Sequence, residues 1–232
     1  MQLGKTLVFL LSFLAVGCTA VRAQDFEYKM ELGGMAGGCF YLGDANYSRF
    51  YKNTGFLGGV IARYNLNPRM VVKGDLAVGH ISGDTSWDDN KFPGGRETTF
   101  SRNLYDLGAQ FEYNFFAYGI GETYKGMRRL TPYILAGMGF TFAPKPVDNV
   151  FTLNFPFGAG IKYKFAKRWN MGVEFTMRFS VSDKLDVTEK GDLQLDDPYG
   201  IKSSGLKNKD SYSFTMFYIT YDFFPKLRKC NN

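Results

Sequence analysis

The sequence predicts an all-β protein, an eight-stranded antiparallel transmembrane β-barrel preceded by an N-terminal signal peptide. The first residues have the layout of a secretory leader, and no later segment has the 18 consecutive apolar residues that a spanning helix needs. Eight later segments alternate apolar and polar residues with period two. The mean hydropathy is slightly negative, which a chain in lipid shows only when its apolar residues alternate with polar ones.

The leader is predicted over residues 1–23. Lys5 precedes an apolar run from Leu7 to Val16, and Ala23 stands at the cleavage position, so the mature chain would begin at Gln24. A competing interpretation makes Cys18 a lipoprotein acylation site, but the sequence upstream of it matches such a site poorly. We therefore expect cleavage and a mature barrel domain over 24–232, with 225–232 as a short periplasmic tail.

The charge and the cysteines exclude some functions. Removal of the leader takes away Lys5 and Arg22 and leaves 26 basic against 22 acidic residues, a net charge of +4 that is too small to indicate nucleic-acid binding. Two cysteines remain, Cys39 and Cys230. They fall at opposite ends of a predicted barrel about 25 Å tall, so we expect two unpaired thiols.

The first strand is predicted from Phe26, with Tyr28, Met30 and Leu32 on the outer face of the barrel. The second runs from Gly55 to Tyr64 and the third over 70–82. The remaining predicted strands, in order, are a fourth that ends near Phe115, a fifth over Pro132 to Phe142, a sixth over 154–165, a seventh over 171–181 and an eighth over 211–224. The fifth has the weakest pattern, because it is apolar or glycine on both faces.

The connections alternate in length, as in outer-membrane barrels with short periplasmic turns and long outer loops. Residues 65–69 and 166–168 are short, whereas 42–54, 83–98 and 183–210 are long. This places the barrel in the cell outer membrane, with both termini periplasmic. Residues 116–131 break the pattern, since this periplasmic connection is long and carries the basic residues Lys125, Arg128 and Arg129. These three are candidate partner-binding residues for an acidic surface, with a solvated basic turn as the alternative.

Aromatic residues are predicted to form a girdle at the periplasmic interface, where amphipathic rings settle. The candidates are Tyr28, Tyr64, Phe115, Tyr133, Phe165, Trp169 and Phe223.

The inward faces carry charges of both signs, which predicts an interior filled by ion pairs and not a conducting pore. The candidates are Glu27, Lys29, Glu31, Lys73, Asp75, Glu112, Lys162, Lys164, Glu174 and Arg178.

Catalytic and cofactor motifs are weak, so we expect no enzyme activity, cofactor or metal. His80, with Ser82 and Asp84 nearby in sequence, is the one candidate for a lipid-modifying enzyme. Residues 186–197 resemble a calcium loop, but Lys190 occupies a ligand position. A lipid-modifying barrel enzyme, or a surface adhesin of the small OmpA/OmpX-like type that acts through 183–210, remains the alternative function.

The amino-acid sequence of the strands resembles the PorG-like outer-membrane barrel family of the Bacteroidota type IX secretion system. The stretches that carry the resemblance are GGMAGGCFYLGD (33–44), ARYNLNPR (62–69), FSRNLYDLGAQFEYNFF (100–116), TPYILAGMGFTFAP (131–144), NFPFGAGIKYKFAKRWNMGVEFTMRFSVSDKLD (154–186) and KNKDSYSFTMFYITYDFF (207–224). The resemblance implies a non-enzymatic component of protein secretion. Its implied partners are outer-membrane lipid or lipopolysaccharide and the periplasmic ring and core proteins PorK, PorN and PorM.

Overall fold

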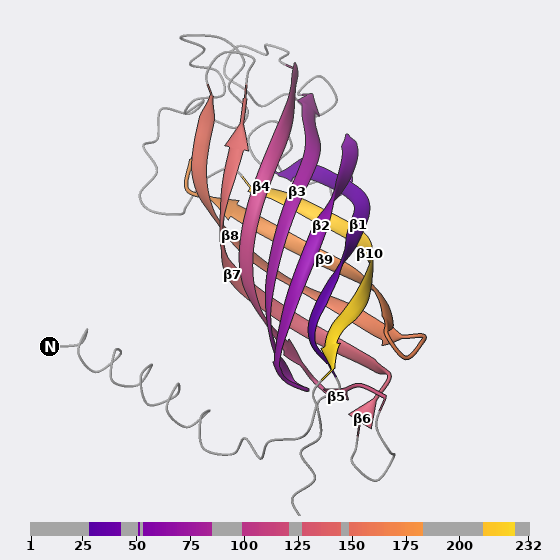
Figure 1. Cartoon of the computed structure of the whole chain (residues 1–232). Coiled ribbons are helices and arrows are strands. Elements are labelled where there is room, and N and C mark those ends of the chain that lie inside the picture. Colours follow the sequence, from indigo (N-terminus) through magenta and orange to yellow (C-terminus); the bar gives the residue numbers. More distant parts are fainter. Residues whose placement is uncertain are drawn as a thin grey trace, which may run out of the picture.

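The computed structural model describes residues 28–42, 51, 53–84, 99–120, 127–144, 149–182 and 211–225 (Figure 1). Its strands are β1 (Tyr28–Leu42), β2 (Thr54–Asn67), β3 (Met70–Asp84), β4 (Thr99–Asn114), β5 (Ala117–Tyr118), β6 (Met127–Arg128), β7 (Leu130–Ala143), β8 (Val150–Lys164), β9 (Trp169–Ser180) and β10 (Ser211–Pro225). The predicted leader, Cys230 and residues 183–210 lie outside the described residues.

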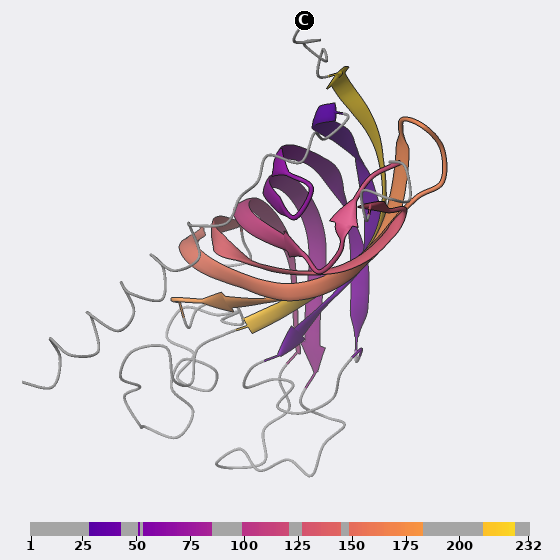
Figure 2. The ribbon, with the colours of Figure 1, turned by 90° about the horizontal axis from the view of Figure 1, so that it is seen from below.

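The eight long strands close into one barrel in the order β1-β10-β9-β8-β7-β4-β3-β2, which confirms the predicted fold class. Neighbours are antiparallel throughout, and the first and last strands close the ring with pairs from Tyr28↔Pro225 to Leu42↔Ser211. Figure 2 shows the strands curving round a common axis. The predicted strands correspond to these eight, and most of them extend by a few residues beyond the predicted bounds.

The barrel has two different ends. At the end that we call the turn end, β2 and β3 are joined by Pro68 and Arg69, and β8 and β9 by residues 165–168. The turn end also carries the connection 115–129, in which β5 and β6 pair as a small parallel sheet. The strand ends flanking 43–53, 85–98, 144–149 and 181–210 define the opposite end, the loop end. β1 starts and β10 finishes at the turn end (Figure 1).

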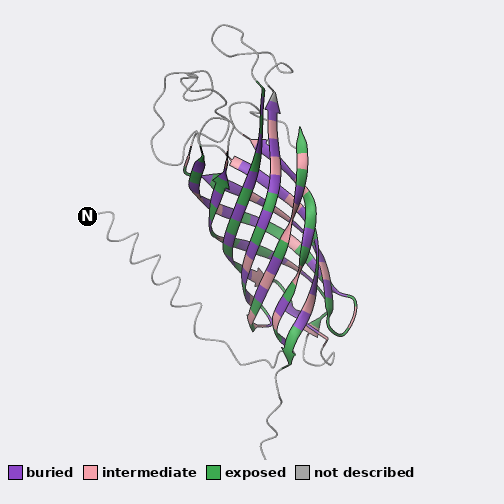
Figure 3. Cartoon of the chain, turned by 45° about the horizontal axis from the view of Figure 1, so that its top comes forward, coloured by how far each residue is buried: buried purple, intermediate pink, exposed green. Residues whose placement is uncertain are grey.

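Burial alternates along the strands, most regularly in β4, where every second residue from Phe100 to Asn114 is buried (Figure 3). The outward residues are largely apolar, for example Leu107 at 57% and Phe157 at 60% exposure. The described residues include no helix that is long and apolar enough to cross a membrane. An apolar outer wall around a closed sheet is stable where lipid, and not water, surrounds it, because closure gives each of the eight long strands a hydrogen-bonded neighbour on both sides.

The interior also holds apolar side chains. They come from several strands and pack into one buried cluster that includes Leu57, Ile61, Leu104, Phe214 and Met216. Cys39 of β1 lies in this cluster as a free thiol that donates to the carbonyl oxygen of His80 at 2.9 Å. Buried charges adjoin the cluster, since the guanidinium of Arg178 lies 4.3 Å from the centre of the Phe214 ring.

Candidate functional site

The charged part of the interior holds equal numbers of cations and anions. Six cationic and six anionic side chains are buried among the described residues. They are Arg63, Lys73, Arg102, Lys162, Lys164 and Arg178 with Glu31, Asp75, Asp106, Glu112, Glu174 and Asp222. A balanced set of this kind limits the cost of burial, since each charge can be paired.

One group of ion pairs lies in the middle of the barrel. Arg63 Nε lies 2.8 Å from Glu112 Oε1, and Lys73 Nζ lies 2.5 Å from Glu174 Oε1. The second oxygen of Glu174 accepts a 2.7 Å hydrogen bond from the hydroxyl of Tyr133. These contacts join β2, β3, β4, β7 and β9 across the lumen.

A second group is centred on Arg178 of β9. Its guanidinium contacts Asp75 at 2.8 Å and also pairs with Asp106. Gln110 donates to Asp75 at 2.5 Å, and the hydroxyl of Tyr212 donates to Asp106 at 2.5 Å. These side chains occupy the described lumen, so the structure favours a filled interior over a pore, as predicted.

Eight of the ten predicted interior charges are buried. Glu27 lies outside the described residues, and the prediction for Lys29 is wrong, because this side chain is exposed. The reason is local: β1 pairs with β2 only from Met30 onward, so Tyr28 and Lys29 extend past the neighbouring wall.

The connection 115–129 closes the lumen at the turn end. Ala117 and Tyr118 are buried. The Tyr118 hydroxyl donates to Asn170 at 2.8 Å, and its backbone N–H donates to the carbonyl oxygen of Pro68 at 3.1 Å. Lys162 Nζ lies 4.7 Å from the centre of the Tyr118 ring, a cation–π contact. The described residues 115–120, the first part of the long predicted turn, therefore form a plug.

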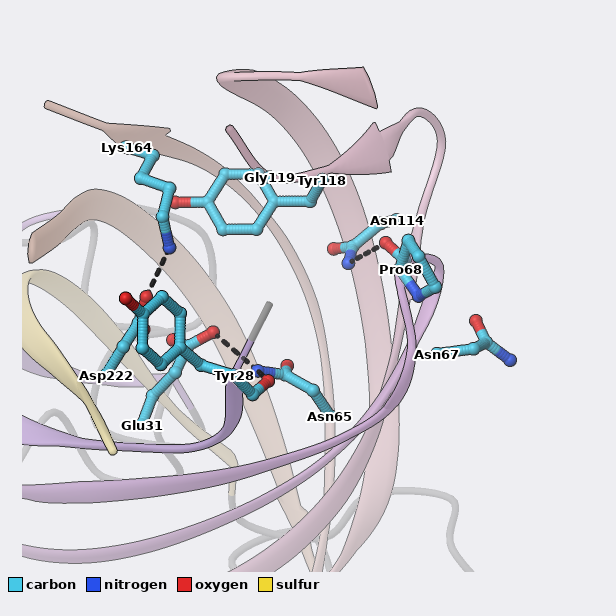
Figure 4. A pocket seen from close by; sticks show the side chains of 10 residues that line it. All are labelled: Tyr28, Glu31, Asn65, Asn67, Pro68, Asn114, Tyr118, Gly119, Lys164 and Asp222. Atoms are coloured by element: carbon cyan, nitrogen blue, oxygen red, sulfur yellow. Dashed lines mark hydrogen bonds and ion pairs between the residues drawn. The ribbon is translucent and has the colours of Figure 1, made fainter. Parts of the chain in front are cut away.

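A small cavity of about 30 Å³ remains beside this plug (Figure 4). Glu31 accepts hydrogen bonds from Asn65 at 3.1 Å and Thr220 at 3.2 Å, while Asp222 pairs with Lys164. The lining residues are Tyr28, Glu31, Asn65, Asn67, Pro68, Asn114, Tyr118, Gly119, Lys164 and Asp222. This volume accommodates about one water molecule, so the plug leaves no room for a larger solute.

Two groups of the turn end have shifted pKa values. Burial, reinforced by the negative charge of Glu31, raises the pKa of the Tyr118 hydroxyl well above its usual range. Hydrogen bonds with the hydroxyls of Tyr221 and Tyr28 raise the pKa of the Arg168 guanidinium. Tyr118 therefore stays a neutral hydrogen-bond donor, and Arg168 stays charged, at any physiological pH.

The exposed charges that the structure describes at the turn end are all basic. Every exposed Lys or Arg side chain among the described residues lies there, and the described acids whose burial is assigned are all buried. We call this surface the basic rim; its members are Lys29, Arg69, Arg128, Arg129, Lys167 and Arg168. Of the three predicted partner-binding residues, Arg128 and Arg129 belong to it, and Lys125 lies outside the described residues.

The predicted aromatic girdle is only partly on the outer wall. Tyr64, Phe115, Phe165, Trp169 and Phe223 are 38% to 47% exposed at the turn end. Trp169 packs edge-on against Tyr221, which in turn packs against Phe223, each with ring centres 5.0 Å apart.

Two members of the predicted girdle are misassigned, because they face the interior. Tyr133 is 1% exposed and belongs to the inward face of β7, which the apolar sequence of that strand concealed. Tyr28 is 7% exposed and lies at the lumen mouth beside Lys164, since β1 has no neighbour in β2 at this position. Neither ring can reach a lipid interface on the outside.

The predicted partners of His80 are also replaced by others. No contact joins Ser82 to the imidazole among the described residues, and the side chain of Asp84 lies outside them. Instead, His80 Nδ1 lies 2.8 Å from Asn103 Oδ1, and Nε2 lies 3.1 Å from Ser101 Oγ. Sequence reasoning missed Ser101 and Asn103 because they belong to the next strand, β4.

No group of three or more His, Cys, Asp or Glu residues that could hold a metal ion occurs within the described part of the chain. The predicted calcium-like segment 186–197 lies outside the described residues.

A closed sheet with an apolar exterior and an ion-paired interior defines a membrane-spanning β-barrel. The chain belongs to the family described as Domain of unknown function (DUF6089), whose model matches residues 5–232. No curated protein matches it.

The chain is similar to several solved structures. Neisserial surface protein A (NspA) is 11% identical with a TM-score of 0.50, and the alignment covers 86% of this chain and 100% of that chain. The N-terminal β-barrel domain of Pseudomonas aeruginosa OprF is 17% identical with a TM-score of 0.44, and the alignment covers 85% of this chain and 98% of that chain. Ail of Yersinia pestis, solved with the heparin analogue sucrose octasulfate, is 13% identical with a TM-score of 0.44, and the alignment covers 86% of this chain and 100% of that chain.

Proposed function

We propose that the chain is a PorG-like component of the type IX secretion system that sits in the outer membrane and docks a periplasmic assembly through its basic rim. The expected partners are the ring and core proteins PorK, PorN and PorM, with outer-membrane lipid or lipopolysaccharide around the barrel. The observation that carries the proposal is that every exposed Lys or Arg side chain among the described residues lies at the turn end.

The closed lumen supports a role in docking. Ion pairs occupy the middle of the barrel, and Tyr118 covers the turn end, so passage through the barrel is a poor explanation of its function. Function then belongs to a surface, and among the described residues the turn end is the surface that carries the exposed cations.

The rim also has an ordered apolar component. The guanidinium of Arg128 lies 4.3 Å from the centre of the Phe116 ring, and Phe116 is 37% exposed. Arginine above an aromatic ring is common at the centre of protein interfaces. An acidic partner surface with an apolar patch would fit this arrangement, and a periplasmic position of the turn end brings it within reach of the ring proteins.

The test is to replace Arg128 and Arg129 together with Glu and to measure co-purification with the ring proteins. Reversing two charges removes about 1–2 kcal/mol of binding free energy, so recovery should fall by roughly 5- to 30-fold. The loss should shrink as salt rises, because salt screens exposed charges. A matched control replaces Lys202 and Lys207, which belong to the connection between β9 and β10, with Glu.

Equal recovery of the rim variant and the wild type would rule the rim out as the docking site. Equal losses in the rim variant and the control would show that net charge, and not the rim, governs the association. Both variants should migrate as folded barrels in unheated gel samples.

A further inference from the structure

A row of three polar side chains crosses the outer wall of the barrel near the loop end. His80 of β3 lies between Ser101 and Asn103 of β4. The amide oxygen of Asn103 can only accept, so the 2.8 Å contact places the imidazole proton on Nδ1. In the neutral imidazole, Nε2 is then the acceptor for the Ser101 hydroxyl at 3.1 Å.

This order of groups has the connectivity of a catalytic triad. A hydroxyl donates to one nitrogen of an imidazole, and an oxygen acceptor orients the other nitrogen. We propose that Ser101, His80 and Asn103 form a hydrolytic site for acyl esters of membrane lipids, with Ser101 as nucleophile, His80 as general base and Asn103 as a positioning residue.

The strand register produces this arrangement. His80 pairs directly with Asn103, and Ser82 pairs with Ser101. The imidazole therefore meets its direct partner and the diagonal neighbour two residues away, both on the outer face. Ser82, the next outward residue of β3 toward the loop end, donates instead to the carbonyl oxygen of Asn53 at 3.4 Å.

The depth of the site fits an ester substrate. Toward the turn end, the next outward residues on these two strands are Val78 at 46% and Tyr105 at 44% exposure. Toward the loop end, the outward residues are Ser82, Ser101 and Thr99. His80 and Asn103 thus mark the border between the apolar wall and a polar collar, the depth at which headgroup esters of a lipid leaflet lie.

The backbone next to Ser101 offers donors for the developing oxyanion. β4 pairs with β3 from Thr99 onward, but with β7 only from Tyr105 onward. Alternate N–H groups of β4 before Tyr105 therefore have no β7 partner among the described residues and are candidate donors. Such donors stabilise the negative oxygen of a tetrahedral intermediate.

The reaction balances with water as the only co-reactant. Ser101 Oγ attacks the ester carbonyl carbon while its proton passes to His80 Nε2. The carbon–oxygen bond to the lipid alcohol breaks, and that alcohol takes the proton from His80. Water then attacks the acyl-serine, again through His80, which releases a carboxylic acid and restores Ser101.

This site is independent of the basic rim, because it lies at the opposite end of the barrel and uses none of its residues. It departs from the expectation that the chain has no enzyme activity. That expectation considered only Ser82 and Asp84 as partners of His80.

The experiment uses the full chain reconstituted in vesicles of phosphatidylethanolamine and phosphatidylglycerol. An alkyl fluorophosphonate should label Ser101, identified by peptide mass spectrometry, and free fatty acid should be released. Ser101→Ala should abolish labelling, and His80→Ala should lower fatty-acid release by at least about 100-fold. Ser82→Ala is the matched control and should be labelled like the wild type.

The role of Asn103 is tested by two further variants. Asn103→Asp keeps an acceptor beside Nδ1 and should retain labelling, whereas Asn103→Leu should lose most of it although the barrel still folds. A folded wild-type protein that neither reacts with the phosphonate nor releases fatty acid would overturn the proposal. Labelling that persists in Ser101→Ala would overturn it as well.

Discussion

Replacement of Arg178 by Met tests whether the interior ion pairs hold the barrel together. Arg178 is fully buried between Asp75 and Asp106, and its guanidinium lies 4.3 Å from the centre of the Phe214 ring. Methionine keeps much of the volume but leaves both carboxylates without this cation. Removing one partner of a buried pair costs about 3–5 kcal/mol.

The cost should stay near that of one pair, although two carboxylates are affected. Asp75 keeps its hydrogen bond from Gln110, and Asp106 keeps hydrogen bonds from Tyr212 and Asn154. These donors continue to compensate part of the buried negative charge.

The assay is urea unfolding of the barrel in vesicles, followed by tryptophan fluorescence. With a slope of about 2 kcal/mol per molar urea, a loss of 3–5 kcal/mol lowers the midpoint by about 1.5–2.5 M. A midpoint within about 0.3 M of the wild type would refute the reasoning.

A compensating variant separates charge from packing. Arg178→Met combined with Asp75→Asn and Asp106→Asn removes the cation and both anions together. Replacing a whole buried ion-pair set is often neutral or stabilising, so this variant should regain most of the lost stability. If it unfolds at the same urea concentration as Arg178→Met alone, lost packing, and not unpaired charge, explains the effect.

Two further predictions concern the plug and the wall. Tyr118→Phe removes the 2.8 Å hydrogen bond to Asn170 and should cost about 1 kcal/mol, with faster amide exchange over residues 115–120 as the local readout. Tyr118→Phe with unchanged exchange would show that the hydroxyl does not hold the plug. Gly33→Ala should prevent or strongly impair folding, because a Cβ at this position runs into the carbonyl oxygen of Ile219. Gly34→Ala is its neighbouring control, since a Cβ there meets only the Gly59 oxygen at 3.8 Å, and it should change stability by less than about 0.5 kcal/mol. Equal folding yields of the two glycine variants would contradict the close approach of β1 and β10 at Gly33.

The barrel could be predicted from the sequence because a strand with one face in lipid and one face in a charged interior has to alternate. β8 and β9 show this most clearly: Phe157 and Ile161 face outward, and Lys162 and Glu174 face inward, as their period-two pattern predicts. The existence of the ion pairs also follows from the pattern. The pattern does not predict which cation pairs with which anion, because Arg63 and Glu112 come from strands that are not adjacent in the barrel.

The sequence-based predictions are wrong at positions where the alternation of apolar and polar residues does not show which way a side chain points. β7 is apolar or glycine on both faces, so its pattern could not show that Tyr133 points inward and donates to Glu174. At the start of β1 the pairing with β2 has not yet begun, although β10 is paired, so Tyr28 can turn into the lumen mouth. Likewise, the partners of His80 depend on the register between β3 and β4, which no single-strand pattern contains.

The filled interior restricts where function can lie. Because ion pairs, the Tyr118 plug and an apolar cluster together occupy the described lumen, a partner or substrate must act on the outside. The two proposed surfaces differ in chemistry because their surroundings differ. The basic rim faces water, where exposed charge attracts an acidic partner over a range set by salt. The Ser101 site lies at the border of the apolar wall, where an uncharged hydrogen-bonded row meets the ester groups of lipid. A rim variant should therefore lose partner binding and keep reaction with the phosphonate, and Ser101→Ala should do the reverse.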